Sequence, residues 1–155
     1  MTVYLVRHAQ AFARHEWRQP DDLRPLSPKG ERQAQGLVDL LACQPVDRVL
    51  SSPSLRCCLT VSPLAEKLAL EVEVVTELLE GASASRAVKL VESVAAGSTG
   101  AVLCSHGDVI PGVLRHLTAM GLKLADPLKW AKGSAWALEH NGLAFTTAHY
   151  LPPPA

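Results

Sequence analysis

The apolar residues of this chain follow two alternating patterns. Short, nearly continuous apolar runs predict buried strands at residues 3–6, 46–50, 72–75 and 101–104. After each of these runs, apolar residues recur every three or four positions, which predicts helices with one buried face. Alternation of strand and helix about four times is typical of an α/β fold with a mostly parallel central sheet. We therefore expect a three-layer α/β/α sandwich.

Capping residues set the bounds of the predicted helices. Ser27 suits the N-cap of the first helix, and Pro28 suits its first helical position. A second helix begins near Leu55, and Pro63 predicts a kink or a break within it. The caps and stops predicted for the third and fourth helices are Ser83, Gly97 and Gly121.

The end of the chain has a different pattern. Two runs with strand propensity, at residues 134–139 and 143–150, flank a turn that contains Asn141 and Gly142. The Asn-Gly pair favours a type I′ turn, so we expect a C-terminal β-hairpin. Three consecutive prolines at 152–154 cannot continue a strand and predict a frayed tail.

The composition fits one globular domain over residues 1–155. Hydrophobic residues make up 48% of the chain and charged residues 19%, which argues against disorder. Lys and Arg number 15, as do Asp and Glu, so no net positive charge attracts nucleic acid or a membrane surface. No apolar run is long enough to span a bilayer, and no signal peptide precedes the first strand. We expect a cytoplasmic protein without nucleic-acid or membrane partners.

The cysteines do not have the spacing of a metal site. Cys104 and His106 are close in the sequence, but two ligands without further partners are too few to hold a metal. We therefore expect no metal and no cofactor. In a reducing compartment, cysteines are most often small buried apolar residues. The four are Cys43, Cys57, Cys58 and Cys104.

Charged residues gather at the carboxyl ends of the predicted strands. Arg7 and His8 follow the first strand, and Arg56 lies shortly after the second. Glu80 follows the third strand, and His106 follows the fourth at the start of a helix. Ligands of open α/β sheets bind beyond the carboxyl ends of the strands, so we expect these side chains to converge.

This set of groups suits a phosphoryl group. Arginine offers a planar fork of donors, and a helix N-terminus such as that at Gly107 adds backbone N–H groups. A neutral imidazole can attack phosphorus, and a carboxyl group can protonate the departing oxygen. Each residue alone is more simply a solvated charge or a packed histidine. Together, at successive strand ends, they favour an anion site.

Four motifs resemble those of the histidine phosphatase superfamily, which has the phosphoglycerate-mutase-like fold. They are LVRHAQA, RPLSPKGERQA, SSPSLRCCLT and CSHGDVI, and they occur in the family's order. The short chain and its Arg-His-Ala variant resemble the SixA-like short branch. The segments HGDVIPGVL and KGSAW are similar to the phosphatase domain fused to some bacterial Nudix (MutT-type) hydrolases.

The resemblance implies a role for each strand-end residue. His8 would be the nucleophile that forms a phosphohistidine, and Arg7 and Arg56 would hold the phosphoryl oxygens. His106 would stabilise the transition state, and the backbone of Gly107 would add a donor. Glu80 would be the general acid; Glu77 is its rival.

Several neighbouring residues have no settled role. Gln10 stands where relatives carry a polar or acidic residue and would shape the leaving-group side, while Leu59 replaces a common glutamine and is read as helix packing. Residues of the 10–26 loop and the next helix are surface residues that could reach the substrate. They are Trp17 as a substrate wall, and Arg14, Arg24 and Lys29 as contacts to a second phosphate.

The sequence favours a metal-independent phosphomonoesterase that acts through a phosphohistidine on a small phosphorylated metabolite or nucleotide. One alternative is a phosphohistidine protein phosphatase like SixA, which would need a shallow site. Another is a non-catalytic partner module of a separate Nudix hydrolase. Mutase activity is disfavoured, because the chain has few residues to spare for a shielded pocket. The substrate and the oligomeric state stay open.

Overall fold

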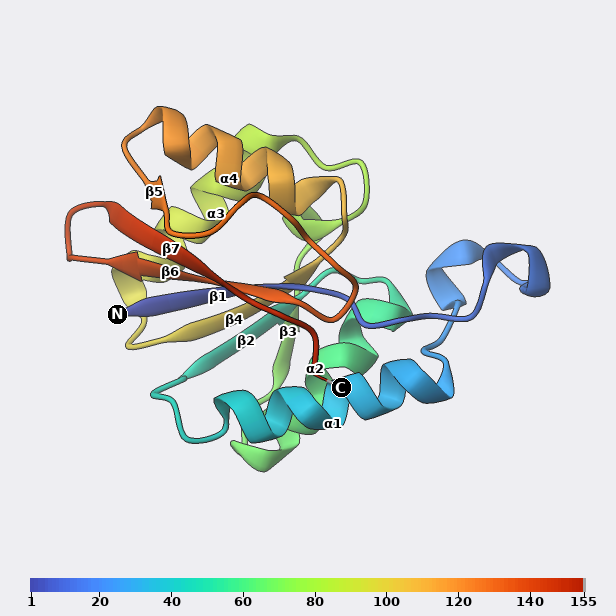
Figure 1. The fold of residues 1–155 in the computed structure, drawn as a ribbon. Coiled ribbons are helices and arrows are strands. Elements are labelled where there is room, and N and C mark those ends of the chain that lie inside the picture. Colours follow the sequence, from blue (N-terminus) through green and yellow to red (C-terminus); the bar gives the residue numbers. More distant parts are fainter. Residues whose placement is uncertain (155) are drawn as a thin grey trace.

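The computed structural model describes residues 1–154 and contains one seven-stranded sheet (Figure 1). Its strand order is β3-β2-β4-β1-β6-β7-β5. The neighbours among β3, β2, β4 and β1 pair in parallel, while β6 runs antiparallel to both β1 and β7. The strands are β1 (Thr2–Arg7), β2 (Arg48–Ser51), β3 (Val72–Val74), β4 (Ala101–Ser105), β5 (Lys123–Leu124), β6 (Ala135–His140) and β7 (Phe145–Leu151).

Helices cover both faces of the sheet, as the sequence predicts. Figure 1 shows α1 and α2 below the sheet and α3 and α4 above it. Successive residues of β1 point to opposite faces: Leu5 packs into the core with α3 and α4, and Val6 packs into the core with α1 and α2. The three-layer α/β/α architecture is therefore confirmed. The helices are α1 (Pro28–Leu41), α2 (Leu55–Lys67), α3 (Ala84–Gly97) and α4 (Val109–Ala119).

The predicted helix starts are confirmed by their capping bonds. The Ser27 hydroxyl accepts a hydrogen bond from the Gly30 N–H, and the Ser83 hydroxyl accepts one from Arg86. A break at Pro63 is wrong, because α2 continues through this residue to Lys67. Val61 and Leu64, on either side of Pro63 in the helix, are completely buried, and their packing holds the helix together where one backbone donor is missing.

The C-terminal hairpin is confirmed, but its type I′ turn is wrong. That turn needs a positive φ at both central residues, and of Asn141 and Gly142 only Gly142 has one, at 98°. The Asn141 side chain instead accepts hydrogen bonds from the N–H groups of Leu143 and Ala144, both at 2.9 Å. Because the side chain takes over these donors, the loop is longer than a two-residue turn.

The proline tail lies against α1 rather than fraying. A Cβ atom at Gly36 would overlap the ring of Pro154, so the helix and the tail are in close contact. Figure 1 shows the C-terminal segment next to α1. No helix within residues 1–154 has the length and apolar character needed to cross a membrane.

The long loop between β1 and α1 has structure of its own. It contains two short 3₁₀ turns, Arg14–Glu16 and Asp21–Leu23. A single antiparallel bridge between Ala11 and Leu26 closes its base. The loop therefore leaves the sheet next to the end of β1 and returns to the same place, beside the strand-end residues.

Candidate active site

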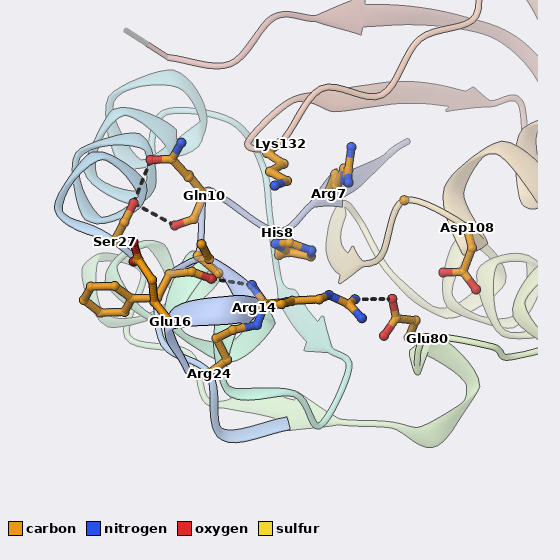
Figure 2. A pocket seen from close by; sticks show the side chains of 14 residues that line it. Arg7, His8, Gln10, Arg14, Glu16, Arg24, Ser27, Glu80, Asp108 and Lys132 are labelled. Atoms are coloured by element: carbon orange, nitrogen blue, oxygen red, sulfur yellow. Dashed lines mark hydrogen bonds and ion pairs between the residues drawn. The ribbon is translucent and has the colours of Figure 1, made fainter. Parts of the chain in front are cut away.

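The structure brings the predicted strand-end residues together at one edge of the sheet. Arg7, His8 and Glu80 line a cavity of about 840 Å³ (Figure 2), as does Gly107. Arg56 and His106 do not line it; both are 1% exposed, and they contact each other beside it. Strands β1 and β4 are parallel neighbours in which Arg7 pairs with Ser105. The residues that follow, His8 and His106, are therefore adjacent, with ring centroids 5.5 Å apart. Arg56 begins α2 after the next strand, and its Nη2 atom lies 3.4 Å from Nδ1 of His106.

His8 has one ring nitrogen fixed and the other free. Its Nδ1 atom lies 2.8 Å from the Ala9 carbonyl oxygen, which can only accept, so Nδ1 carries the proton and Nε2 carries the lone pair. The pKa of His8 is lowered to about 3, mainly by burial and in part by the nearby charges of Arg56, His106 and Arg7, while the hydrogen bond to Ala9 works in the opposite direction. His8 is thus a neutral imidazole at neutral pH, as a nucleophile must be.

A lowered pKa at a buried histidine makes stability depend on pH. The unfolded state binds the proton below its ordinary pKa of 6.5, whereas folded His8 resists it down to about 3. Stability is therefore complete above pH 6.5 and is lost as the pH falls toward 3. We expect His8 alone to reduce the free energy of unfolding by roughly 3 kcal/mol at about pH 4. Urea titrations of wild type and His8→Asn across this range should diverge; parallel curves would contradict the expectation.

Both ring nitrogens of His106 have a polar partner. Its Nε2 lies 2.8 Å from the Ser52 hydroxyl, which in turn accepts from the Ser54 N–H at 3.4 Å. Its Nδ1 lies 3.4 Å from Nη2 of Arg56, and a guanidinium can only donate. Nδ1 therefore carries the lone pair, and Nε2 donates its proton to Ser52. His106 thus accepts from Arg56 and helps to hold the guanidinium in place.

Arg56 is a buried cation held by two carboxylates. It is 1% exposed, and its Nη1 atom lies 3.2 Å from Oδ2 of Asp21 and 3.0 Å from the Asp21 carbonyl oxygen. Its Nη2 atom lies 3.3 Å from Oε2 of Glu80, whose other oxygen pairs with Arg14 at 3.0 Å. These contacts anchor the guanidinium at the edge of the sheet and draw the 10–26 loop toward it.

Arg7 reaches the site through a gap left by a glycine. A Cβ atom at Gly107 would lie 2.8 Å from Cζ of Arg7, so a side chain there would push the guanidinium out of this position. Its Nη1 atom donates to the Trp130 carbonyl at 2.8 Å. Within residues 1–154, the Nε atoms of Arg7 and Arg56 are buried donors without a hydrogen-bond partner. Such donors are costly unless a ligand accepts from them, and an anion would do so.

The structure separates Glu80 from its rival. Glu80 lines the cavity, whereas Glu77 lies outside its lining and pairs with Arg86 on α3 at 3.7 Å. Asp108, which sequence reasoning missed, also lines the cavity. Its Oδ2 accepts from the Gly81 N–H at 2.7 Å and so fixes the turn that carries Glu80. Its position directly after His106 and Gly107 was the available signal.

The loop residues divide between the cavity and the surface. Gln10, Arg14 and Arg24 line the cavity, whereas Trp17 and Lys29 do not. The indole N–H of Trp17 donates to the Pro20 carbonyl within the loop itself. Neither residue is therefore placed to contact a substrate in the cavity.

Lys132 is the functional candidate that sequence reasoning missed. It lines the cavity from the segment before β6, far along the chain from the other basic residues (Figure 2). The neighbouring Gly133 N–H lies 3.2 Å from the Arg7 carbonyl and 3.1 Å from the His8 carbonyl. These bonds fix the segment against the end of β1. The motif KGSAW contains Lys132, but nothing in the sequence pattern brings it to the first strand.

Other residues of the segment RPLSPKGERQA (24–34) support the loop rather than the chemistry. The Gln33 side chain accepts from the Gln10 N–H at 2.9 Å and donates to the Lys132 carbonyl at 3.3 Å. At Gly30, a Cβ atom would overlap the Gln10 carbonyl, so this position needs glycine. The first turn of α1 thus fixes the backbone just after His8.

The positive charge of the site comes from side chains. No group of three His, Cys, Asp or Glu residues within 1–154 is arranged to hold a metal ion. Arg7 and Arg56 can neutralise a bound anion themselves.

The expectation that the cysteines are buried holds for Cys57 and Cys104 and is wrong for Cys43, which is exposed.

Comparison with known proteins agrees with the site. The sequence profile of the histidine phosphatase superfamily (branch 1) matches residues 3–84. An 8-oxo-(d)GTP phosphatase of Mycolicibacterium smegmatis is 30% identical over 156 residues, which cover 99% of this chain and 48% of that protein. The chain therefore spans about half the length of this curated relative.

Solved structures show the same fold at lower identity. The protein histidine phosphatase SixA, in complex with tungstate, superposes with a TM-score of 0.78 and 20% identity, covering 100% of this chain and 97% of SixA. A mycobacterial glucosyl-3-phosphoglycerate phosphatase superposes with a TM-score of 0.74 and 19% identity, covering 99% of both chains. At these identities the likeness establishes the fold.

Proposed function

The chain belongs to the histidine phosphatase superfamily, and on this premise we propose that it is a metal-independent phosphomonoesterase that acts through a phosphohistidine. One observation carries the proposal: a neutral His8, with the lone pair on Nε2, lines the cavity beside Arg7 and has Arg56 and His106 as buried neighbours. A nucleophile surrounded by fixed donors is the arrangement that phosphoryl transfer needs. The substrate would be a small phosphorylated metabolite or a nucleotide.

In the first step, Nε2 of His8 attacks phosphorus and the bond to the leaving oxygen breaks. Arg7 and Arg56 would donate to the three other oxygens and balance their negative charge in the transition state, while His106 holds Arg56 in place. The Ala9 carbonyl holds the proton on Nδ1 of His8 and stabilises the positive charge that develops on the ring. Glu80, a carboxylate paired with Arg56 in the structure, would take up a proton from water when substrate oxygens replace it as the acceptor for Arg56, and would then give that proton to the leaving oxygen.

In the second step, a water molecule attacks phosphorus and the bond to His8 breaks. Glu80, now a carboxylate, would take the proton from this water. The products are inorganic phosphate and free His8, so the cycle closes without a metal or a cofactor.

A phosphohistidine protein phosphatase is the second candidate. The superposition on SixA, which covers the whole chain, supports it. The loop at 10–26 also supports it, because its half-exposed Phe12 side chain lines the cavity and would offer an apolar contact to a protein substrate. A role as a non-catalytic partner of a Nudix hydrolase is disfavoured, because the chain keeps the full set of site residues: His8, His106, Arg7 and Arg56.

Hydrolysis in the presence of a chelator tests the proposal. Because arginine and histidine supply the positive charge, we expect 5 mM EDTA to leave the rate of p-nitrophenyl phosphate hydrolysis unchanged. Phosphate release from a panel of metabolites, nucleotides and a phosphohistidine peptide then identifies the substrate class. Loss of activity in EDTA that added magnesium or zinc restores would contradict the metal-independent mechanism.

A further inference from the structure

Two cations at the cavity have no acidic partner. Arg14 pairs with Glu80, Arg24 pairs with Asp21, and Arg56 pairs with both carboxylates. Within residues 1–154, Arg7 and Lys132 form no ion pair. Arg7 belongs to the phosphoryl site, which leaves the charge of Lys132 without a role.

Lys132 is held in place and close to other positive charges. Its carbonyl accepts from Gln33, and the next residue, Gly133, bonds to the carbonyls of Arg7 and His8. Partial burial lowers the pKa of Lys132, and the charges of Arg7, Arg24, Arg14 and Arg56 lower it further. A lysine that repels its neighbours in this way is stabilised when an anion enters.

The transferred phosphoryl group does not need this additional charge. It has three oxygens outside the scissile bond, and within residues 1–154 Arg7 and Arg56 already offer buried donors that have no other partner. The cavity of about 840 Å³ is much larger than a phosphoryl group and extends from His8 to Lys132 and Arg14. Lys132 lies on the wall of this cavity, on a different segment of the chain from Arg7, Arg56 and His8, so its charge can face what the phosphoryl group is attached to.

We propose that Lys132 binds a second anionic group carried by the leaving group, so that preferred substrates are phosphoanhydrides such as nucleoside diphosphates. This inference rests on the proposed phosphatase function and specifies its substrate. His8 would attack the terminal phosphorus, and the bond to the bridging oxygen would break. The electron pair stays on the oxygen of the departing monophosphate, whose charge Lys132 balances.

Substrates with different leaving groups test the subsite. We expect Lys132→Met to lower kcat/KM for ADP by about tenfold or more, mainly through KM, and that for p-nitrophenyl phosphate by about threefold at most. Lys132→Arg keeps the charge and should restore most of the loss. Lys29→Met is the matched control, because Lys29 is exposed outside the cavity. Equal losses on both substrates, or no loss on ADP, would overturn the subsite.

Ligand binding separates this inference from the phosphatase proposal. By calorimetry at fixed ionic strength, Lys132→Met should weaken inorganic pyrophosphate at least about fivefold more than inorganic phosphate. If wild type hydrolyses nothing but shows this pattern, the subsite stands and the phosphatase proposal falls. If wild type is an active phosphatase and both ligands weaken equally, the phosphatase proposal stands and the subsite falls.

Discussion

Replacing His8 with Ala is expected to lower kcat by about 10⁴-fold or more while the protein stays folded, because the variant lacks the atom that bonds to phosphorus. In wild type mixed with radiolabelled substrate and quenched in alkali, the label should remain on the protein and be released by acid, as phosphohistidine chemistry requires. Circular dichroism and thermal melting verify that the variant is folded.

The matched control for His8 is His116→Ala. His116 is an exposed histidine on α4, outside the cavity, so its removal should leave both turnover and labelling unchanged. If His8→Ala turned over at the wild-type rate, water would attack phosphorus directly and the covalent mechanism would be wrong. Labelling that persists in His8→Ala would place the nucleophile on another residue.

The sequence was sufficient to predict features that depend on local chemistry. Ser27 and Ser83 mark helix starts because their hydroxyl groups accept from a nearby backbone N–H in any context. The convergence of His8 and His106 follows from parallel pairing, which brings the carboxyl ends of β1 and β4 to one edge. These predictions needed the chain direction and the order of elements, but no knowledge of side-chain packing.

Features that depend on distant contacts were not predictable in the same way. Asn141 and Gly142 match a type I′ turn, but the Asn141 side chain takes over two backbone donors and lengthens the loop. The prolines at 152–154 pack on α1 because Gly36 leaves room for Pro154. Because β6 pairs antiparallel with β1, the start of β6 lies next to the end of β1. Lys132, which comes shortly before β6, reaches the cavity in this way. None of these partners is near in the sequence.

Glu80→Gln is expected to slow hydrolysis of an alkyl phosphate about a hundredfold, with a much smaller effect on p-nitrophenyl phosphate. An alkoxide is a poor leaving group and needs a proton as the bond to phosphorus breaks, whereas nitrophenolate leaves without one. The substitution keeps the size of the side chain and an oxygen that Arg56 can bond. Any effect on the position of Arg56 should therefore reduce both rates equally.

Two variants make the assignment specific. Glu77→Gln should change neither rate, because Glu77 pairs with Arg86 outside the cavity. Asp108→Asn retains an oxygen for the Gly81 N–H, so it should keep the turn that carries Glu80 and show no selective loss. A selective loss in either variant would move the acid to that residue, and equal losses on both substrates in Glu80→Gln would make Glu80 a positioning residue for Arg56. The leaving-group dependence thus tests proton donation itself, since a change that only moves Arg56 cannot distinguish an alkyl from a nitrophenyl ester.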